Sequence, residues 1–291
     1  MHRILVACAV AVAAAVALPS TALAWAPAST ATVHPGVQTI TEGAQCTANF
    51  IYTAPSATTA SKRTGRKALA AVASVDTYIG QAAHCSGTGA ATETDGCDSA
   101  SLPIGTPVEV DGASRPGTMV YNSWITMQEA GETDAATCAY NDLALIKLDP
   151  VDVAVTNPSV PGLGGPTGLA SLGDTGSTVY TYGNSSLRGG VTTLSPKQGV
   201  VVGRDPSGWS TDVYTATPGI PGDSGSGFLT DAGEAAGVLS TVQIAPLAGS
   251  NGVGDLPLEV AYMRAHGGPQ ASLENATEPF NPDLVSAILG G

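Results

Sequence analysis

Three short stretches of the chain contain the residue types that nucleophilic catalysis needs. His84 lies in the sequence AAHC at 82–85, Asp142 opens the apolar run in NDLALIKL at 141–148, and Ser224 lies in the glycine-rich sequence PGDSGSG at 221–227. A serine hydroxyl attacks a carbonyl efficiently only when a base accepts its proton, and imidazole suits that role because its pKa lies near neutrality. A carboxylate behind the ring fixes its tautomer and stabilises the imidazolium. These residues therefore predict acyl transfer, with Ser224 as nucleophile, His84 as general base and Asp142 as the orienting carboxylate.

The glycines around Ser224 indicate a second element of the same chemistry. Glycine allows the tight turns that other residues resist. Such turns can aim the N–H groups of Gly222 and Ser224 at one position, where the oxyanion of a tetrahedral intermediate would develop. One donor of this kind stabilises the transition state by about 3–4 kcal/mol. The stretch thus predicts an oxyanion hole beside the nucleophile.

Taken together, the three stretches resemble a known family. They occur in the order His, Asp, Ser, 58 residues apart (84 to 142) and 82 residues apart (142 to 224). In this they resemble the chymotrypsin-like serine proteases of the trypsin superfamily, of the secreted bacterial type. Subtilisin-like enzymes place the aspartate first and α/β-hydrolases place the serine first, so both fit less well. The resemblance covers about residues 36–265 and implies two six-stranded antiparallel β-barrels packed face to face, with the triad in the cleft between them.

The resemblance also implies supporting roles for residues outside the triad. Asp223 matches the aspartate whose ion pair orders the oxyanion hole, and Ser240 matches the serine that hydrogen-bonds the triad carboxylate. Cys46 matches the partner of the cysteine beside the histidine. The implied disulfides are Cys46–Cys85 and Cys97–Cys138.

The chain departs from the family pattern at several positions. Gln81 stands where threonine is usual, and Thr241 stands where tryptophan is common. No Ile-Val-Gly-Gly-like new N-terminus precedes Cys46, so the usual partner of Asp223, a freed α-amino group, is not evident. Some bacterial relatives use an arginine instead, and Arg188 is the candidate here; a surface arginine in a glycine-rich turn is the alternative interpretation.

The resemblance gives little about substrate preference. Pro218 occupies the position six residues before the nucleophile, which matches the floor of the specificity pocket. Because proline carries no negative charge, the resemblance does not support cleavage after Lys or Arg. A neutral or small side chain is the better expectation.

The N-terminus has the pattern of a secretory signal peptide. A basic start at His2 and Arg3 precedes an apolar run at 4–18 and the small-residue sequence Ala-Leu-Ala at 22–24, which predicts a signal peptide over 1–24. The run is shorter than the ~20 residues of a spanning helix, so a membrane anchor is the weaker alternative. We expect a secreted protein. Its four cysteines after loss of Cys8 favour two disulfides, although the count alone allows three pairings.

Charge and ligand patterns limit the partners. The chain has 11 Lys and Arg against 24 Asp and Glu, a formal net charge of −13. This acidity disfavours nucleic acid and anionic membranes, so the expected partner is a protein or peptide substrate. A zinc site is disfavoured because no Cys-x-x-Cys pair is present. No cofactor and no metal are expected, and the protein is expected to be a monomer.

The chain segments that must position these residues are predicted to form short strands. The chain has 36 glycines and 20 prolines, and between them lie brief runs rich in Val, Thr, Ile and Tyr, which predict an all-β chain of two packed six-stranded antiparallel β-barrels. A short C-terminal helix is predicted at 284–289. The expected strands lie at 37–41, 47–52, 75–80, 108–110, 143–148, 178–182, 199–202, 213–216, 225–229 and 236–242. The expected division is a short pro-segment or arm at 25–35, an N-terminal barrel at 36–155, a linker at 156–173, a C-terminal barrel at 174–265 and an extension at 266–291.

The predicted function is therefore a secreted serine endopeptidase that works through an acyl-enzyme. Two alternatives stay open. A secreted binding protein on a protease scaffold would share the fold without the activity. An enzyme with the same acyl-transfer groups that acts on esters would differ only in its substrate.

Overall fold

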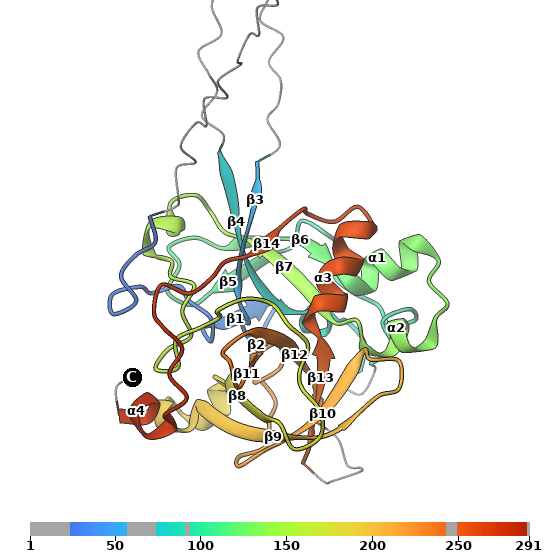
Figure 1. Ribbon diagram of the computed structural model, residues 1–291. Helices are drawn as coiled ribbons and strands as arrows, with labels where there is room; N and C mark the ends of the chain where they lie inside the picture. The colour runs from blue at the N-terminus through green and yellow to red at the C-terminus, as the bar shows by residue number, and fades with distance from the viewer. Residues whose placement is uncertain (1–23, 57–73, 91–93, 243–248, 290–291) are drawn as a thin grey trace, which may run out of the picture.

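Two arrays of short antiparallel strands, one in each half of the chain, make up the computed structural model (Figure 1). The structure describes residues 24–56, 74–90, 94–242 and 249–289. The N-terminal array is an eight-stranded sheet in the order β14-β3-β4-β7-β6-β5-β1-β2. Its strands are β1 (Gln38–Thr41), β2 (Ala44–Thr47), β3 (Ile51–Pro55), β4 (Val75–Ala82), β5 (Pro107–Val110), β6 (Gly117–Asn122), β7 (Leu143–Lys147) and β14 (Ser272–Leu273).

Side-chain patterns explain where these strands lie in the sheet. β5 alternates exposed and buried residues, as expected for a strand with one face toward the core. β7 lies between β4 and β6 and is buried at all of its residues except Lys147, which fits its unbroken apolar run. The register pairs Ala82 with Leu143, so the end of β4 and the start of β7 lie side by side. This register brings the AAHC stretch next to Asp142.

The C-terminal array closes into a six-stranded barrel in the order β10-β13-β12-β11-β8-β9. Neighbouring strands pair antiparallel around the whole circuit. The strands are β8 (Thr178–Tyr182), β9 (Pro196–Arg204), β10 (Ser210–Thr215), β11 (Gly227–Thr230), β12 (Ala235–Val242) and β13 (Asn251–Asp255). The Ser224 stretch leads directly into β11.

The mostly-β architecture and the short C-terminal helix, α4 (Leu284–Leu289), are confirmed. The N-terminal sheet is barrel-like but has eight strands rather than six, partly because β14 from the C-terminal extension pairs with β3. Three further helices were not predicted: α1 (Ser123–Ala130), α2 (Ala135–Tyr140) and α3 (Leu256–Ala265). Strands β6, β13 and β14, and all of β2 except Thr47, were also not predicted.

Polar caps start the unpredicted helices. The Asn122 side chain accepts hydrogen bonds from the N–H groups at 124 and 125, and Gly131 in a left-handed conformation ends α1. Asp134 and Asp255 cap α2 and α3 in the same way. An acceptor at the N-cap satisfies the free donors of a first turn. These caps were the available sequence signal for the three helices.

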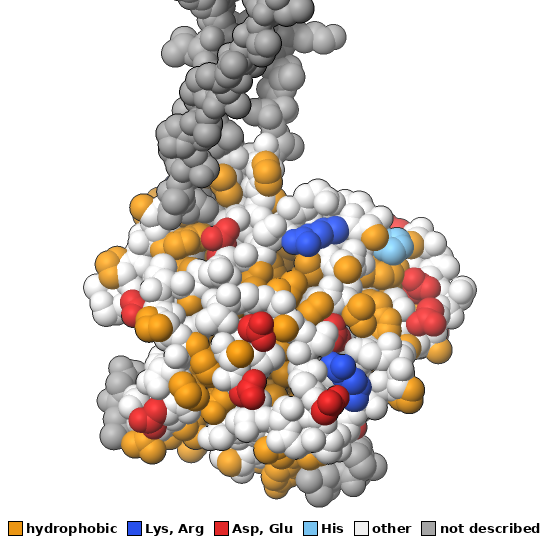
Figure 2. Space-filling view, in the orientation of Figure 1, with side chains coloured by type: hydrophobic (Ala, Val, Ile, Leu, Met, Phe, Trp, Pro, Cys, Tyr) orange, Lys and Arg blue, Asp and Glu red, His pale blue; other side chains and the backbone are white. Residues whose placement is uncertain are grey.

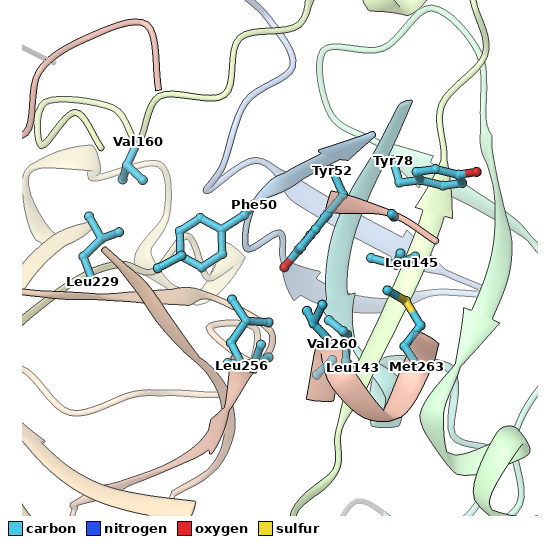
Figure 3. Packing of buried hydrophobic residues seen from close by; sticks show 14 of the residues in the cluster. Phe50, Tyr52, Tyr78, Leu143, Leu145, Val160, Leu229, Leu256, Val260 and Met263 are labelled. Atoms are coloured by element: carbon cyan, nitrogen blue, oxygen red, sulfur yellow. The ribbon is translucent and has the colours of Figure 1, made fainter. Parts of the chain in front are cut away.

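A shared apolar core holds the two halves against each other. Figure 3 shows Phe50 from the N-terminal half between Leu229 and Leu256 from the C-terminal half. Phe50 is 1% exposed, and a Cβ added at Gly227 would lie 2.5 Å from its ring. Close packing of this kind resists any change of volume. The relative position of the two halves, and of any site between them, is therefore set by well-packed side chains.

The two ends of the described chain also pack on the body. The N–H of Ala26 donates to the carbonyl of Thr156 (3.0 Å), and the side chain of Val33 is fully buried. Residues 25–35 were expected as a loose arm or pro-segment, and the structure places them against residues 155–157. At the other end, Phe280 makes an edge-on contact with Tyr180. The expected signal peptide at 1–24 lies outside the described residues apart from its last position, and the remaining domain boundaries stay predictions.

The surface reflects the composition. Acidic side chains are scattered over the face seen in Figure 2 and are more frequent there than basic ones, as the net charge of −13 leads one to expect. Within the described part of the chain, no helix is both long and apolar enough to cross a membrane.

Candidate active site

The His84 and Asp142 side chains meet where β4 and β7 lie side by side. His84 belongs to a short 3-10 helix, η1 (Ala83–Ser86), that directly follows β4. Its Nδ1 lies 2.6 Å from Oδ2 of Asp142, and its backbone N–H donates to Oδ1 of the same carboxylate (2.9 Å). Ser240 Oγ donates to Asp142 Oδ2 from β12 of the other half (2.5 Å). The carboxylate therefore accepts three hydrogen bonds, and the structure brings these three predicted residues together.

The electrostatics of this pair favour a protonatable imidazole. Burial is the largest influence on His84 and lowers its pKa, but the charge of Asp142 and its hydrogen bond raise it, and the net pKa lies above the usual value of 6.5. The Asp142 side chain is only 3% exposed, against 25% for His84. A charge pair of this kind is stronger when water is excluded. With Nδ1 engaged by the carboxylate, Nε2 is the nitrogen left to accept a proton.

Ser224 lies in a turn that contacts both halves of the molecule. Its carbonyl accepts from the N–H of Thr47 (2.8 Å), and the N–H of Gly225 donates to the carbonyl of Leu239 (2.8 Å). A Cβ added at Gly225 would lie 2.8 Å from the backbone nitrogen of Ala82. The loop that carries Ser224 thus packs against the end of β4, two residues before His84. The Ser224 hydroxyl makes no hydrogen bond to the described residues and is half-buried.

The backbone of this turn leaves two donors free. The N–H groups of Asp223, Gly225 and Ser226 all donate to carbonyls of the protein. Those of Gly222 and Ser224 donate to none within the described residues. Gly222 has φ of 95°, a conformation that favours glycine. Two unpaired backbone donors beside Ser224 are the arrangement that an oxyanion hole requires.

Asp223 is buried beneath the turn, with 0% exposure, and is held by several donors. Arg188 forms an ion pair with its Oδ2 through Nη2, as sequence reasoning suggested. Lys197 Nζ lies 2.7 Å from the same oxygen. The N–H groups of Ser185 and Ile220 donate to the carboxylate as well. A buried carboxylate with this many charged partners anchors the turn firmly.

Lys197 was missed at the sequence level. It lies on β9 and is only 3% exposed at its side chain. Burial lowers its pKa most, the charge and hydrogen bond of Asp223 raise it, and nearby Arg188 lowers it again, so that its pKa lies below the usual value. A lone lysine just outside a predicted strand, here the one at 199–202, normally indicates a solvent-facing position. No local pattern could have revealed the burial, which results from closure of the barrel.

Glu259 was also missed. This residue of α3 is fully buried, and its Oε1 accepts a hydrogen bond from the backbone N–H of Asp142 (2.9 Å). It connects the helix of the C-terminal half to the backbone of Asp142. A glutamate four residues after Asp255, a capping residue, usually lies on an exposed first turn. The sequence therefore gave no reason to place it in the core.

The disulfides join the pairs that the resemblance implied. Cys46 bonds to Cys85, with 6.2 Å between the Cα atoms, and Cys97 bonds to Cys138, with 5.2 Å. The first ties β2 to the residue after His84. The second ties α2 to the loop at 94–99. The only groups of three potential metal ligands among the described residues each contain two of these disulfide cysteines, so their sulfurs are already bonded.

Comparison with known proteins gives a structural likeness only. No protein-family model matches the chain, and no curated protein matches it. Among solved structures it is similar to Protease A of Thermobifida fusca, at 16% identity over 84% of this chain and 99% of that one, with a TM-score of 0.48. It is similar to a Nocardiopsis protease at 18% identity over 83% and 98%, also with a TM-score of 0.48. A glutamic acid specific serine protease is similar at 15% identity over 83% and 100%, with a TM-score of 0.45. Likenesses this distant carry no statement about activity, which depends on the geometry of the site.

Proposed function

We propose that this protein is a secreted serine endopeptidase. In this reaction His84 Nε2 takes the proton of Ser224 Oγ as that oxygen attacks the carbonyl carbon of a peptide bond. The N–H groups of Gly222 and Ser224 donate to the resulting oxyanion. Asp142 holds the ring through Nδ1 and stabilises the imidazolium.

The intermediate then breaks down in two stages. His84 returns its proton to the leaving amine, the C–N bond breaks and an ester of Ser224 remains. A water molecule attacks this acyl-enzyme, again losing its proton to His84. The C–O bond to Ser224 then breaks, Ser224 Oγ takes the proton back from His84, and the carboxylic acid is released. No cofactor takes part in these steps.

The single observation that best supports this proposal is the Asp142 carboxylate. It accepts from Nδ1 of His84 at 2.6 Å and from Ser240 Oγ at 2.5 Å while nearly excluded from solvent. A purely structural His–Asp pair has no need for unpaired backbone donors next to a serine in a neighbouring turn. The signal-peptide pattern at 1–24 and the two disulfides support export from the cell.

Digestion of a peptide library tests the proposal. The protein without residues 1–24 should release new N-termini from internal peptide bonds, and Ser224→Ala should release none. If the folded wild type cleaves esters but not peptides, the enzyme is an esterase with the same groups. If it cleaves neither, the protein is a binding protein on a protease scaffold and the proposal is wrong.

A further inference from the structure

One buried carboxyl group contacts the site but has no part in the reaction above. Helix α3 runs from the closed barrel toward the β7 side of the N-terminal sheet (Figure 1). Glu259 on this helix is 0% exposed, and its Oε1 accepts from the N–H of Asp142 at 2.9 Å. The backbone leaves room for it, because a Cβ at Gly254 would lie 2.6 Å from that oxygen. Oε2 of Glu259 has no partner among the described residues.

The surroundings of Glu259 disfavour a negative charge. Burial raises its pKa most, and the carboxylates of Asp142 and Asp255 raise it further, whereas the N–H of Asp142 lowers it; the net pKa lies well above the usual 4.5. Two further titratable groups lie near it, Tyr52 on β3 and Tyr121 on β6, both buried; burial raises the pKa of each, and a negative charge on Glu259 would raise it further. No cation of the described residues forms an ion pair with it. A buried carboxyl group that has no cation beside it keeps its proton.

We propose that Glu259 is a positioning residue for the triad, a neutral carboxylic acid whose Oε1 holds the backbone of Asp142 in place. This proposal rests on the function proposed above. The side chain of Asp142 must meet two donors from His84 and one from Ser240 at the same time. A hydrogen bond to its own N–H restrains the rotation that would break all three. A neutral acid provides that acceptor without placing a second anion behind the imidazole.

Three variants separate positioning from simple packing. Glu259→Leu removes the acceptor and leaves the N–H of Asp142 buried and unpaired. Glu259→Gln keeps an acceptor oxygen and the neutral charge. Met263→Ala is the matched control, because Met263 is equally buried on α3 but makes no hydrogen bond to the site.

Kinetics at neutral pH give the first readout. Glu259→Leu should lower kcat by about 10- to 100-fold with little change in KM, since an unsatisfied buried donor loosens the group that orients the base. Glu259→Gln should restore kcat to within about threefold of the wild type. Met263→Ala should lower stability while leaving kcat of the folded protein unchanged. Equal kcat values for Glu259→Leu and Met263→Ala would overturn the proposal.

The acid limb of kcat/KM gives the second readout. If Glu259 is neutral, Glu259→Gln removes no charge, and the apparent pKa of His84 stays where it is in the wild type. If Glu259 were an anion, the same change would remove a negative charge near the ring and shift the limb to lower pH. A shift of that kind would overturn the assignment of a neutral acid.

Stability gives a readout that does not depend on catalysis. The unfolded chain loses this proton near pH 4.5 and the folded chain keeps it, so the wild type should lose stability relative to Glu259→Gln as the pH rises from about 5 to 8. The urea midpoints are compared in the Ser224→Ala background. A pH-independent difference would show that Glu259 is ionised in the fold and would overturn the proposal. An inactive wild type with the expected pH dependence would instead reject the proposed function while leaving the neutral acid intact.

Discussion

The two cations that hold Asp223 can be removed one at a time, and the structure predicts that their effects on stability are not additive. Lys197 and Arg188 bind the same oxygen of a carboxylate that is fully buried. Replacing Lys197 by Met removes one charged hydrogen bond, which contributes about 1.5–3 kcal/mol. It also removes the burial of the ammonium and its repulsion by Arg188, both of which lower the pKa of Lys197. The net cost of Lys197→Met should therefore be only about 1 kcal/mol.

The same argument applies to Arg188→Met, because Lys197 still neutralises the carboxylate. The double variant differs, since Asp223 then has no cation and only backbone donors. Leaving a buried charge without its partner costs about 3–5 kcal/mol. The coupling between the two substitutions should thus be about 2 kcal/mol, within the range known for residues of one charged network.

Urea denaturation followed by tryptophan fluorescence measures these free energies of unfolding. All variants are compared in the Ser224→Ala background, so that self-digestion does not interfere. Peptide cleavage is measured separately with Ser224 present, and the double variant should lose at least 100-fold in kcat because the turn that carries the oxyanion donors is no longer anchored. Free energies that add to within about 0.5 kcal/mol would refute the idea that the two cations share the burial of Asp223.

Three further outcomes follow from the site. The pKa of His84 lies above 6.5, so kcat/KM should fall as the pH drops through a value above 6.5. Asp142→Asn should move this acid limb of the pH–rate profile to lower pH and lower kcat by about 10⁴-fold. An acid limb that stays in place in the variant would contradict this. Cys85→Ser and Cys97→Ser each remove one disulfide and open a loop of 39 or 41 residues, respectively. Each should lower the free energy of unfolding by about 4 kcal/mol in denaturation experiments. Only Cys85→Ser should also reduce the activity of the folded protein. Gly222→Ala would place a Cβ 2.2 Å from the Gln45 side chain and would force alanine to adopt a φ of 95°. Cleavage should therefore fall by at least 100-fold. Wild-type kinetics for this variant would contradict the role assigned to the turn.

The parts of the site that could be predicted from sequence are those written in short local patterns. The surroundings of His84, Asp142 and Ser224 are each a few consecutive residues, and the strands that carry them are short runs with turn residues between them. The apolar run of β7 and the Val, Thr and Tyr residues of β8 were recognised as strands because residue type along a strand reflects its burial and β-propensity.

The missed parts depend on contacts between distant segments. Glu259 and Lys197 are charged residues that pattern reasoning assigns to the surface, yet packing of α3 on the sheet and closure of the barrel bury them. β14 joins the N-terminal sheet across more than 200 residues of chain, from Ser272 back to Thr53. Helix α1 was not predicted: its first turn holds Trp124, Ile125 and Thr126, whose low helix propensity hides the cap at Asn122.

The central claim is that Ser224 is an activated nucleophile, and covalent labelling tests it most directly. The purified protein is treated with a fluorophosphonate, its mass is measured intact, and the modified residue is located by peptide mapping. One label per molecule is expected, on Ser224, with none on Ser224→Ala and much slower labelling of His84→Ala. A correctly folded wild type that takes up no label, or takes it up at another residue, would contradict the account.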